Sequence, residues 1–112
     1  MRVIDHRKVA KRIKLLGRIC AWAWDLPLKR IVINEALDDC FGRCWWQRGD
    51  VEIRLTTLGD KPRLIKDWHL RDTLAHELAH LIEHGHTKAH RELRDALKMW
   101  LKRNWKREWK EI

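Results

Sequence analysis

Residues 76–80 have the sequence His-Glu-Leu-Ala-His, and they determine the interpretation of the rest of the chain. Positions i and i+4 of a helix share one face, so a helix here presents the imidazoles of His76 and His80 to a single zinc ion. Glu77 lies one step further round that helix, where it can reach a metal-bound water as a general base. The spacing therefore predicts a hydrolase with one Zn²⁺ per chain, His76 and His80 as ligands, and Glu77 as the catalytic residue.

A catalytic zinc needs a third protein ligand, and three more histidines follow the motif closely. His84 is one further i+4 step along the same helix, about 6 Å beyond His80 by helix rise, which makes a shared metal hard to reach. Gly85 is expected to end that helix in the left-handed conformation, and a reversal there would bring His86 back toward the metal. We therefore predict His86 as the third ligand, with His84 and then His90 as alternatives.

The sequence around the motif favours a helix. Residues 67–75 are typical of a helix start that leads into apolar positions at near-helical spacing: Leu74, Leu78, Leu81 and Ile82. Thr87 then opens a second helical pattern. A motif helix, a turn and a third donor together indicate a metallohydrolase, and the alternative is a histidine-rich surface helix that binds no metal.

The motif region resembles a known family. Thr-Leu-Ala-His-Glu-Leu-Ala-His at 73–80, followed by Gly-His-Thr-Lys-Ala-His at 85–90, looks like the SprT-like zinc metallopeptidases and the related WLM group. Upstream segments resemble strands of that family: 31–34, 42–46 and 53–55. The resemblance implies that residues 1–112 form a single SprT-like zinc metallopeptidase domain. A weaker resemblance, to the ImmA/IrrE peptidases, implies a peptidase specific for one regulatory protein and keeps His84 among the candidate ligands.

Two departures from the family pattern affect the site. His90 stands where the family usually has Phe or Trp, so it either packs behind the metal or acts in the site. The chain contains no tyrosine, although many zinc peptidases stabilise the oxyanion with a Tyr or His. We expect a histidine such as His84 or His90, or an arginine, in that role.

Composition limits the class of protein. A chain of 112 residues is expected to form one domain with a modest core. Its formal charge of +9 favours contact with polyanions. No apolar run approaches the roughly 20 residues that span a bilayer, and the charged start lacks the apolar segment of a signal peptide. We expect a cytoplasmic protein with no membrane partner, or a nucleoid or nuclear one if it acts on DNA. Reduced, partly buried thiols are expected at Cys20, Cys40 and Cys44.

The periodicity predicts an α+β fold with a zincin-like arrangement. A leading helix over 5–24 and a C-terminal helix over 87–109 accompany the motif helix and a small three-stranded, mostly antiparallel sheet. Its strands are expected at 29–34, 44–47 and 51–56. The last of these is the candidate edge strand that pairs with an extended substrate beside the cleft. The alternative is an ordinary sheet strand.

The end of the chain combines cations with aromatic rings. Lysine and arginine side chains can neutralise phosphates, and indole rings can stack on unpaired bases. The candidate nucleic-acid contacts are Lys102, Arg103, Trp105, Lys106, Arg107, Trp109 and Lys110. The alternative is a solvated basic helix end, which the helix dipole also favours.

The favoured function is zinc-dependent hydrolysis of peptide bonds. Glu77 would accept the proton of the attacking water and pass it to the leaving amine. The family resemblance implies a protein or peptide substrate that is associated with DNA, either single-stranded or crosslinked to the substrate. Three alternatives stay open: a nucleic-acid-binding module whose zinc is structural, a peptidase for one regulatory protein, and a zinc hydrolase for a non-peptide bond, since the motif specifies the metal and the base but not the bond that is cleaved. Metal ligation by both His84 and His86 would indicate the structural class.

Overall fold

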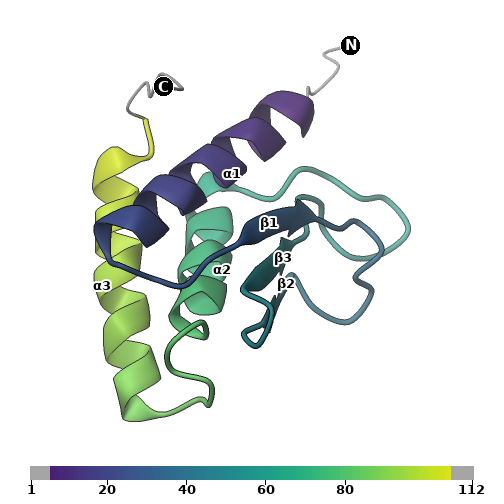
Figure 1. Cartoon of the computed structure of the whole chain (residues 1–112). Helices are drawn as coiled ribbons and strands as arrows, with labels where there is room; N and C mark the ends of the chain where they lie inside the picture. The colour runs from purple at the N-terminus through teal and green to yellow at the C-terminus, as the bar shows by residue number, and fades with distance from the viewer. Residues whose placement is uncertain (1–5, 107–112) are drawn as a thin grey trace.

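The computed structural model describes residues 6–106, and these form three helices and one three-stranded sheet (Figure 1). The elements follow one another as α1 (His6–Ala23), β1 (Arg30–Ile33), β2 (Gly42–Trp45), β3 (Asp50–Ile53), α2 (Asp67–Ala79) and α3 (Lys88–Asn104). Helix α2 contacts the sheet on one side and α3 on the other, and α1 lies across β1, α2 and α3. The predicted α+β fold is confirmed.

The sheet has the order β1-β3-β2 and is mixed. Strand β3 pairs in parallel with β1, with Ile31 opposite Val51, and antiparallel with β2, with Cys44 opposite Val51. The prediction that residues 51–56 form an edge strand is therefore wrong, because β3 is hydrogen-bonded along both sides. Strand β2 lies at the edge of the sheet, and α2 packs against it.

Helix α1 is amphipathic, with Ile13, Leu16 and Cys20 buried at helical spacing. Its C-terminal end is closed by Asp25 at φ 53°, where the amide of Leu26 donates to the carbonyl of Ala21 at 2.8 Å. This is the arrangement of a Schellman cap, with an aspartate in the left-handed position that usually holds glycine. The first residue of the predicted helix over 5–24 lies outside the described residues.

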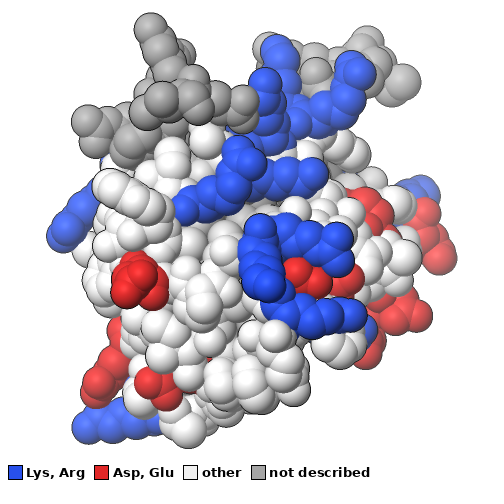
Figure 2. Space-filling model, in the orientation of Figure 1, with Lys and Arg blue, Asp and Glu red and all other residues white. Residues whose placement is uncertain are grey.

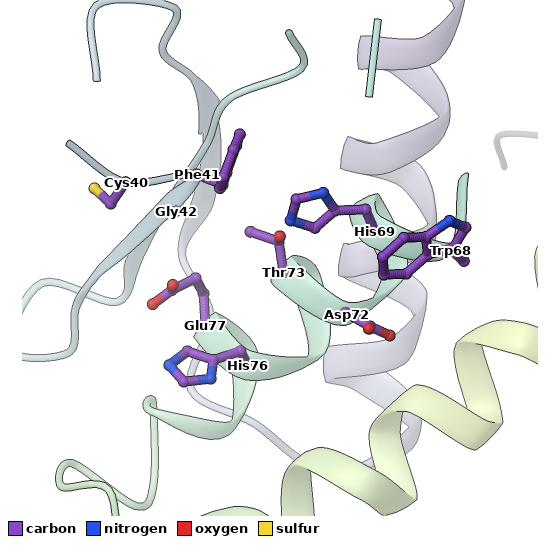
Figure 3. Close-up of a pocket in the computed structure, with 9 residues that line it drawn as sticks. All are labelled: Cys40, Phe41, Gly42, Trp68, His69, Asp72, Thr73, His76 and Glu77. Atoms are coloured by element: carbon purple, nitrogen blue, oxygen red, sulfur yellow. The ribbon is translucent and has the colours of Figure 1, made fainter. Parts of the chain in front are cut away.

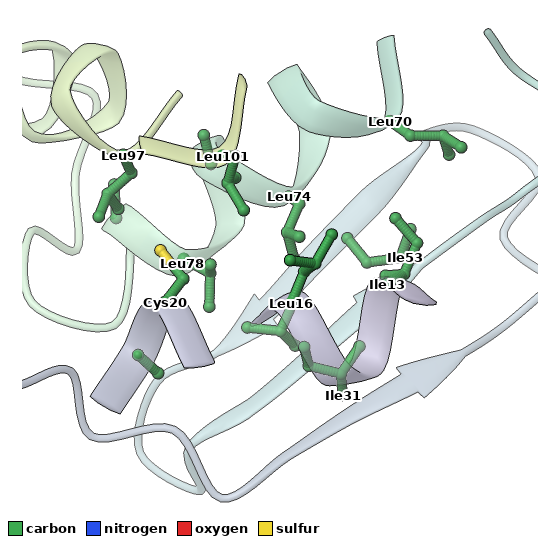
Figure 4. Packing of buried hydrophobic residues seen from close by; sticks show 14 of the residues in the cluster. Ile13, Leu16, Cys20, Ile31, Ile53, Leu70, Leu74, Leu78, Leu97 and Leu101 are labelled. Carbon is green, nitrogen blue, oxygen red and sulfur yellow. The ribbon is translucent and has the colours of Figure 1, made fainter. Parts of the chain in front are cut away.

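The core lies where the three helices meet the sheet (Figure 4). Leu70, Leu74 and Leu78 recur along α2 and are fully buried, and Leu97 and Leu101 of α3 meet them from the other side. Burial of about five such leucines is worth roughly 1.5–3 kcal/mol each before the entropy of folding is counted. This packing fixes α2, and α2 in turn positions the histidine motif.

The C-terminal part of the chain differs from the prediction. Helix α3 ends at Asn104, and Trp105 is 1 % exposed and packs in the core, with the guanidinium of Arg71 5.3 Å from its ring centre. The prediction that Trp105 stacks on bases is wrong, because its ring is covered by protein. Lys102, Arg103 and Lys106 are exposed as expected. The candidates Arg107, Trp109 and Lys110 lie outside the described residues.

The cysteines and the apolar content of the helices were the subject of two predictions from composition. The three cysteines are free thiols, with Cys20 buried and Cys40 and Cys44 half-buried. Among the helices of residues 6–106, none combines the length and the apolar character needed to cross a membrane.

Candidate metal centre and cleft

Three imidazoles converge at the end of α2. His76 and His80 lie in or just after the last turn of α2, and His86 comes from the segment that leads to α3. The Nε2 atom of His80 lies 3.1 Å from that of His76 and 3.3 Å from that of His86, and the remaining pair is 3.3 Å apart. A tetrahedral zinc with Zn–N bonds of 2.0–2.1 Å places its ligand atoms about 3.3 Å apart. The three histidines are therefore close enough, and correctly spaced, to hold one metal ion.

The chain reaches His86 by a different route from the one expected. Helix α2 ends at Ala79, and the amides of Leu81 and Glu83 donate to carbonyls of the last helical turn, which turns the chain away from the helix axis. The residues of positive φ within 6–106 do not include Gly85. The prediction of a left-handed reversal at Gly85 is wrong, because the tight turn over residues 80–83 already redirects the chain.

His80 is oriented by a hydrogen bond on the far side of its ring. Its Nδ1 lies 2.9 Å from the carbonyl oxygen of Glu83. A carbonyl oxygen only accepts, so Nδ1 carries the hydrogen and Nε2 is left with a free lone pair for a metal. Such a second hydrogen bond fixes both the tautomer and the angle of a metal-binding imidazole.

His90 lies behind the metal group and is not part of it. Its ring is 1 % exposed and stacks on the ring of His80, with centroids 4.0 Å apart and an interplanar angle of 20°. Its Nε2 lies 3.1 Å from the carbonyl oxygen of His76 and donates to it. The alternatives in which His90 is a ligand or an oxyanion donor do not agree with this position, because the ring is buried and its donor is occupied.

His84 also lies outside the metal group. Its exposed ring stacks on Trp46, with centroids 3.7 Å apart and an interplanar angle of 9°. Trp46 belongs to the β2–β3 turn, so the stack joins that turn to the loop that carries His86. His84 is therefore placed to hold the loop rather than to bind the metal.

Glu77 is buried beside the histidines and faces the start of β2. Glu77 is 7 % exposed, and a Cβ added to Gly42 would lie 2.8 Å from Cγ of Glu77. Burial raises the pKa of Glu77 to about 7, and the positive charge of Arg43 opposes that rise. A dication held by the neighbouring histidines would lower the pKa again, since it favours the carboxylate. Burial, together with the nearby imidazoles, lowers the pKa of His76 to about 4, so its ring is neutral as metal binding requires.

A cleft extends from Glu77 in two directions. One cavity, of about 440 Å³, runs along α2 toward Phe41, Trp68 and His69 (Figure 3). A second, of about 370 Å³, runs toward the metal group, and its lining includes Arg43, Trp46 and His84. Both cavities are lined by Gly42, His76 and Glu77. The glutamate thus lines both cavities, one toward the start of α2 and one toward the metal group.

The sequence model of the SprT-like family matches residues 9–103, which is most of the chain. The chain belongs to the SprT-like family. No match was found among curated proteins or among solved structures.

Four residues that line the metal-side cavity of this SprT-like chain were not anticipated as site residues: Gly42, Arg43, Cys44 and Trp46. Their positions in the sequence predicted a strand and no further role. The available signal was the glycine, since a glycine in a short strand often marks a close approach of another group. Here that group is Glu77.

Proposed function

We propose that this SprT-like chain is a zinc-dependent metallopeptidase. The observation that carries the proposal is the grouping of three metal-spaced imidazoles next to a buried carboxylate in an open cleft. His76, His80 and His86 would hold the Zn²⁺, and an all-imidazole donor set suits this ion. When bound, the ion would lower the pKa of a water molecule and polarise the scissile carbonyl. Glu77 would accept the proton of the attacking water and deliver it to the leaving amine nitrogen.

The shape of the cleft supports a polypeptide substrate. Strand β2 is the edge of the sheet next to α2, and its outer side forms no strand pairing among residues 6–106. An extended peptide can add to such an edge through main-chain hydrogen bonds. The substrate-pairing role that was expected for residues 51–56 therefore passes to Gly42–Trp45. Because a cavity extends from Glu77 on each side, we expect the enzyme to be an endopeptidase.

Arg43 and His84 are the candidates for stabilising the oxyanion. Both line the cavity that contains the metal group. Arg43 already contacts Asp39 at 3.6 Å, with its side chain 42 % exposed, so it retains freedom to reach into the cleft. A guanidinium supplies several donors to developing negative charge.

The charge of the molecule supports substrates associated with DNA. Helix α1 has no acidic residue and exposes six cations, and Figure 2 shows lysine and arginine side chains along the face that α1 crosses. They are Arg7, Lys8, Lys11, Arg12, Lys14 and Arg18. With Trp105 buried, α1 replaces the C-terminal end as the favoured surface for DNA. Binding to single-stranded DNA should weaken steeply between 50 and 200 mM salt, and binding that ignores salt would count against the DNA contact.

The structural-zinc alternative receives less support. It requires His84 as a fourth ligand, whereas the ring of His84 is stacked on Trp46 and the group among the described residues consists of three histidines. Three protein ligands with one open position are typical of catalytic zinc.

The experiment that tests the proposal compares the parent with Glu77→Gln. Metal content would be measured together with cleavage of casein and histones, with and without single-stranded DNA. We expect one zinc per chain in both proteins and a loss of activity of about 10²- to 10⁴-fold in Glu77→Gln. The control is Glu92→Gln, which removes an exposed carboxylate of α3 and should cleave like the parent. Equal cleavage by Glu77→Gln would refute the mechanism, and a zinc-loaded parent that cleaves no protein or peptide would refute the function.

A further inference from the structure

The two ends of the cleft have different chemistry. The end that lies along α2 is walled by three rings: Phe41, just before β2, and Trp68 and His69 in the first turn of α2 (Figure 3). The rings of Phe41 and His69 meet edge to face with centroids 4.6 Å apart, and those of Trp68 and His69 lie 5.3 Å apart at 19°. The metal end is lined by Arg43, by the histidines and by Trp46, whose ring already stacks on His84 with centroids 3.7 Å apart. A substrate that fills the cleft would therefore meet the rings of Phe41, Trp68 and His69 on one side of the scissile bond, and a mixed surface of Arg43, histidines and Trp46 on the other.

The distance from the reaction centre fits a polypeptide. His69 and Glu77 are eight positions apart on one straight helix, which is about 12 Å at 1.5 Å per residue. An extended chain advances about 3.3 Å per residue. The aromatic wall is thus within reach of a side chain that belongs to one of the first three residues beyond the scissile bond.

The charges around this end favour an apolar occupant over a basic one. Apart from Glu77, the carboxylate that lines the cavity is that of Asp72, and its Oδ1 lies 3.2 Å from the ammonium of Lys98. A lysine or arginine of the substrate would have to compete with that pair. A planar apolar side chain needs only the exposed ring faces, and Trp68 is 55 % exposed.

We propose that Phe41, Trp68 and His69 form a subsite for a bulky aromatic side chain of the substrate, within about three residues of the scissile bond and on one side of it. The inference rests on the proposed peptidase function and adds a substrate preference to it. Rings pack against one another edge to face or offset, and the subsite offers both a tilted and a nearly parallel partner.

The test uses the zinc-loaded full chain and a peptide library whose cleavage sites are identified by mass spectrometry. We expect Phe or Trp to be enriched at one position on one side of the cut. Matched peptides with Phe or Ala at that position should then differ in kcat/KM by about 10-fold or more. Trp68→Ala should reduce that ratio about fivefold, because one of the three rings is lost. The matched control is Trp22→Ala, which removes a tryptophan that is 84 % exposed on α1 and should leave the ratio unchanged.

A binding measurement separates this inference from the peptidase proposal. Short peptide hydroxamates carrying Phe or Ala would be titrated calorimetrically into the zinc-loaded parent and Trp68→Ala, since their binding needs no turnover. Tighter binding of the Phe compound to the parent, lost in Trp68→Ala, supports the subsite even if no peptide is cleaved. The inference is overturned if the Phe and Ala compounds bind with equal affinity to the parent and to Trp68→Ala. It is also overturned if the cleavage sites show a preference for Lys or Arg at that position.

Discussion

The two walls of the cleft are held in place by different kinds of interaction. The α2 wall carries His76, Glu77 and His80 within little more than one helical turn, and buried leucines anchor that helix to the core. The β2 wall takes its position from pairing with β3 and brings Gly42 and Trp46 to the site from 30 or more positions away in the sequence. Substitutions in the α2 wall should therefore remove a metal ligand or the general base, whereas substitutions in the β2 wall should shift the position of these groups.

The largest effect is expected on the α2 wall, from His80→Ala. Removing a neighbour of a metal ligand typically weakens binding 10- to 100-fold, so removing a ligand should weaken zinc binding by more than about 100-fold. When the concentration of free zinc is about 100 times its Kd, zinc binding stabilises the folded parent by about 2.7 kcal/mol. Calorimetry should show a rise in Tm with zinc for the parent and none for the variant. His6→Ala is the control, because it removes an exposed histidine at the start of α1; a zinc-dependent Tm in His80→Ala would contradict the three-histidine site.

The next largest effect is expected on the β2 wall, from Gly42→Ala. The new Cβ would lie 2.8 Å from Cγ of Glu77 and 2.8 Å from Cγ2 of Thr73, so the glutamate must move. We expect overpacking to cost about 1–3 kcal/mol of unfolding free energy and kcat/KM to fall about tenfold or more, since small displacements at a reacting centre are costly. Zinc affinity, measured separately, should change little because no ligand is touched.

Gly85→Ala is the matched control on the opposite side of the site. A Cβ there would meet only Cγ2 of Thr87, at an ordinary 3.7 Å. Its unfolding free energy should stay within about 0.5 kcal/mol of the parent. If Gly42→Ala cleaves as fast as Gly85→Ala, then β2 does not restrain the glutamate and the proposed difference between the walls is lost.

The same difference explains what could be predicted from the sequence. The grouping of His76 and His80 depends on i, i+4 spacing alone, so it could be predicted before any fold was known. His86 joins them, but through the turn after Ala79 and not through a reversal at Gly85. The edge strand was misassigned because strand order depends on which segments pair across long separations, and β1 occupies the side of β3 that was expected to be open. Trp105 was misassigned because burial at a helix end is decided by tertiary packing, which the pattern of charges around it does not report.

The variant His90→Phe tests how strongly zinc binding by the α2 wall depends on the buried residue behind His80. The variant keeps a ring next to His80 but loses the donor to the carbonyl of His76. One neutral hydrogen bond is worth about 0.5–1.5 kcal/mol. Because the ring is retained and only this bond is lost, we expect the zinc Kd to rise by about three- to tenfold. The comparison is His90→Ala, which also empties a buried site and should cost about 2–4 kcal/mol of stability. Unchanged zinc affinity in His90→Phe would show that the ring stack alone positions His80.

The smallest effect is expected from Trp46→Ala, which tests whether the β2 wall also helps to hold a metal ligand. The stack of Trp46 on His84 ties the turn after β2 to the loop that carries His86. An aromatic pair of this kind is worth about 0.5–1.5 kcal/mol, so its loss should raise zinc Kd about two- to tenfold. Trp45→Ala is the matched control: the indole NH of Trp45 donates to Glu52 at 2.9 Å, and its ring lies next to the guanidinium groups of Arg43 and Arg48. Titration of zinc against a competing chelator would distinguish the two variants. A rise in Kd for Trp46→Ala alone would mean that the strand wall positions the third ligand as well as the glutamate, whereas equal affinities would confine metal binding to α2 and its following turn.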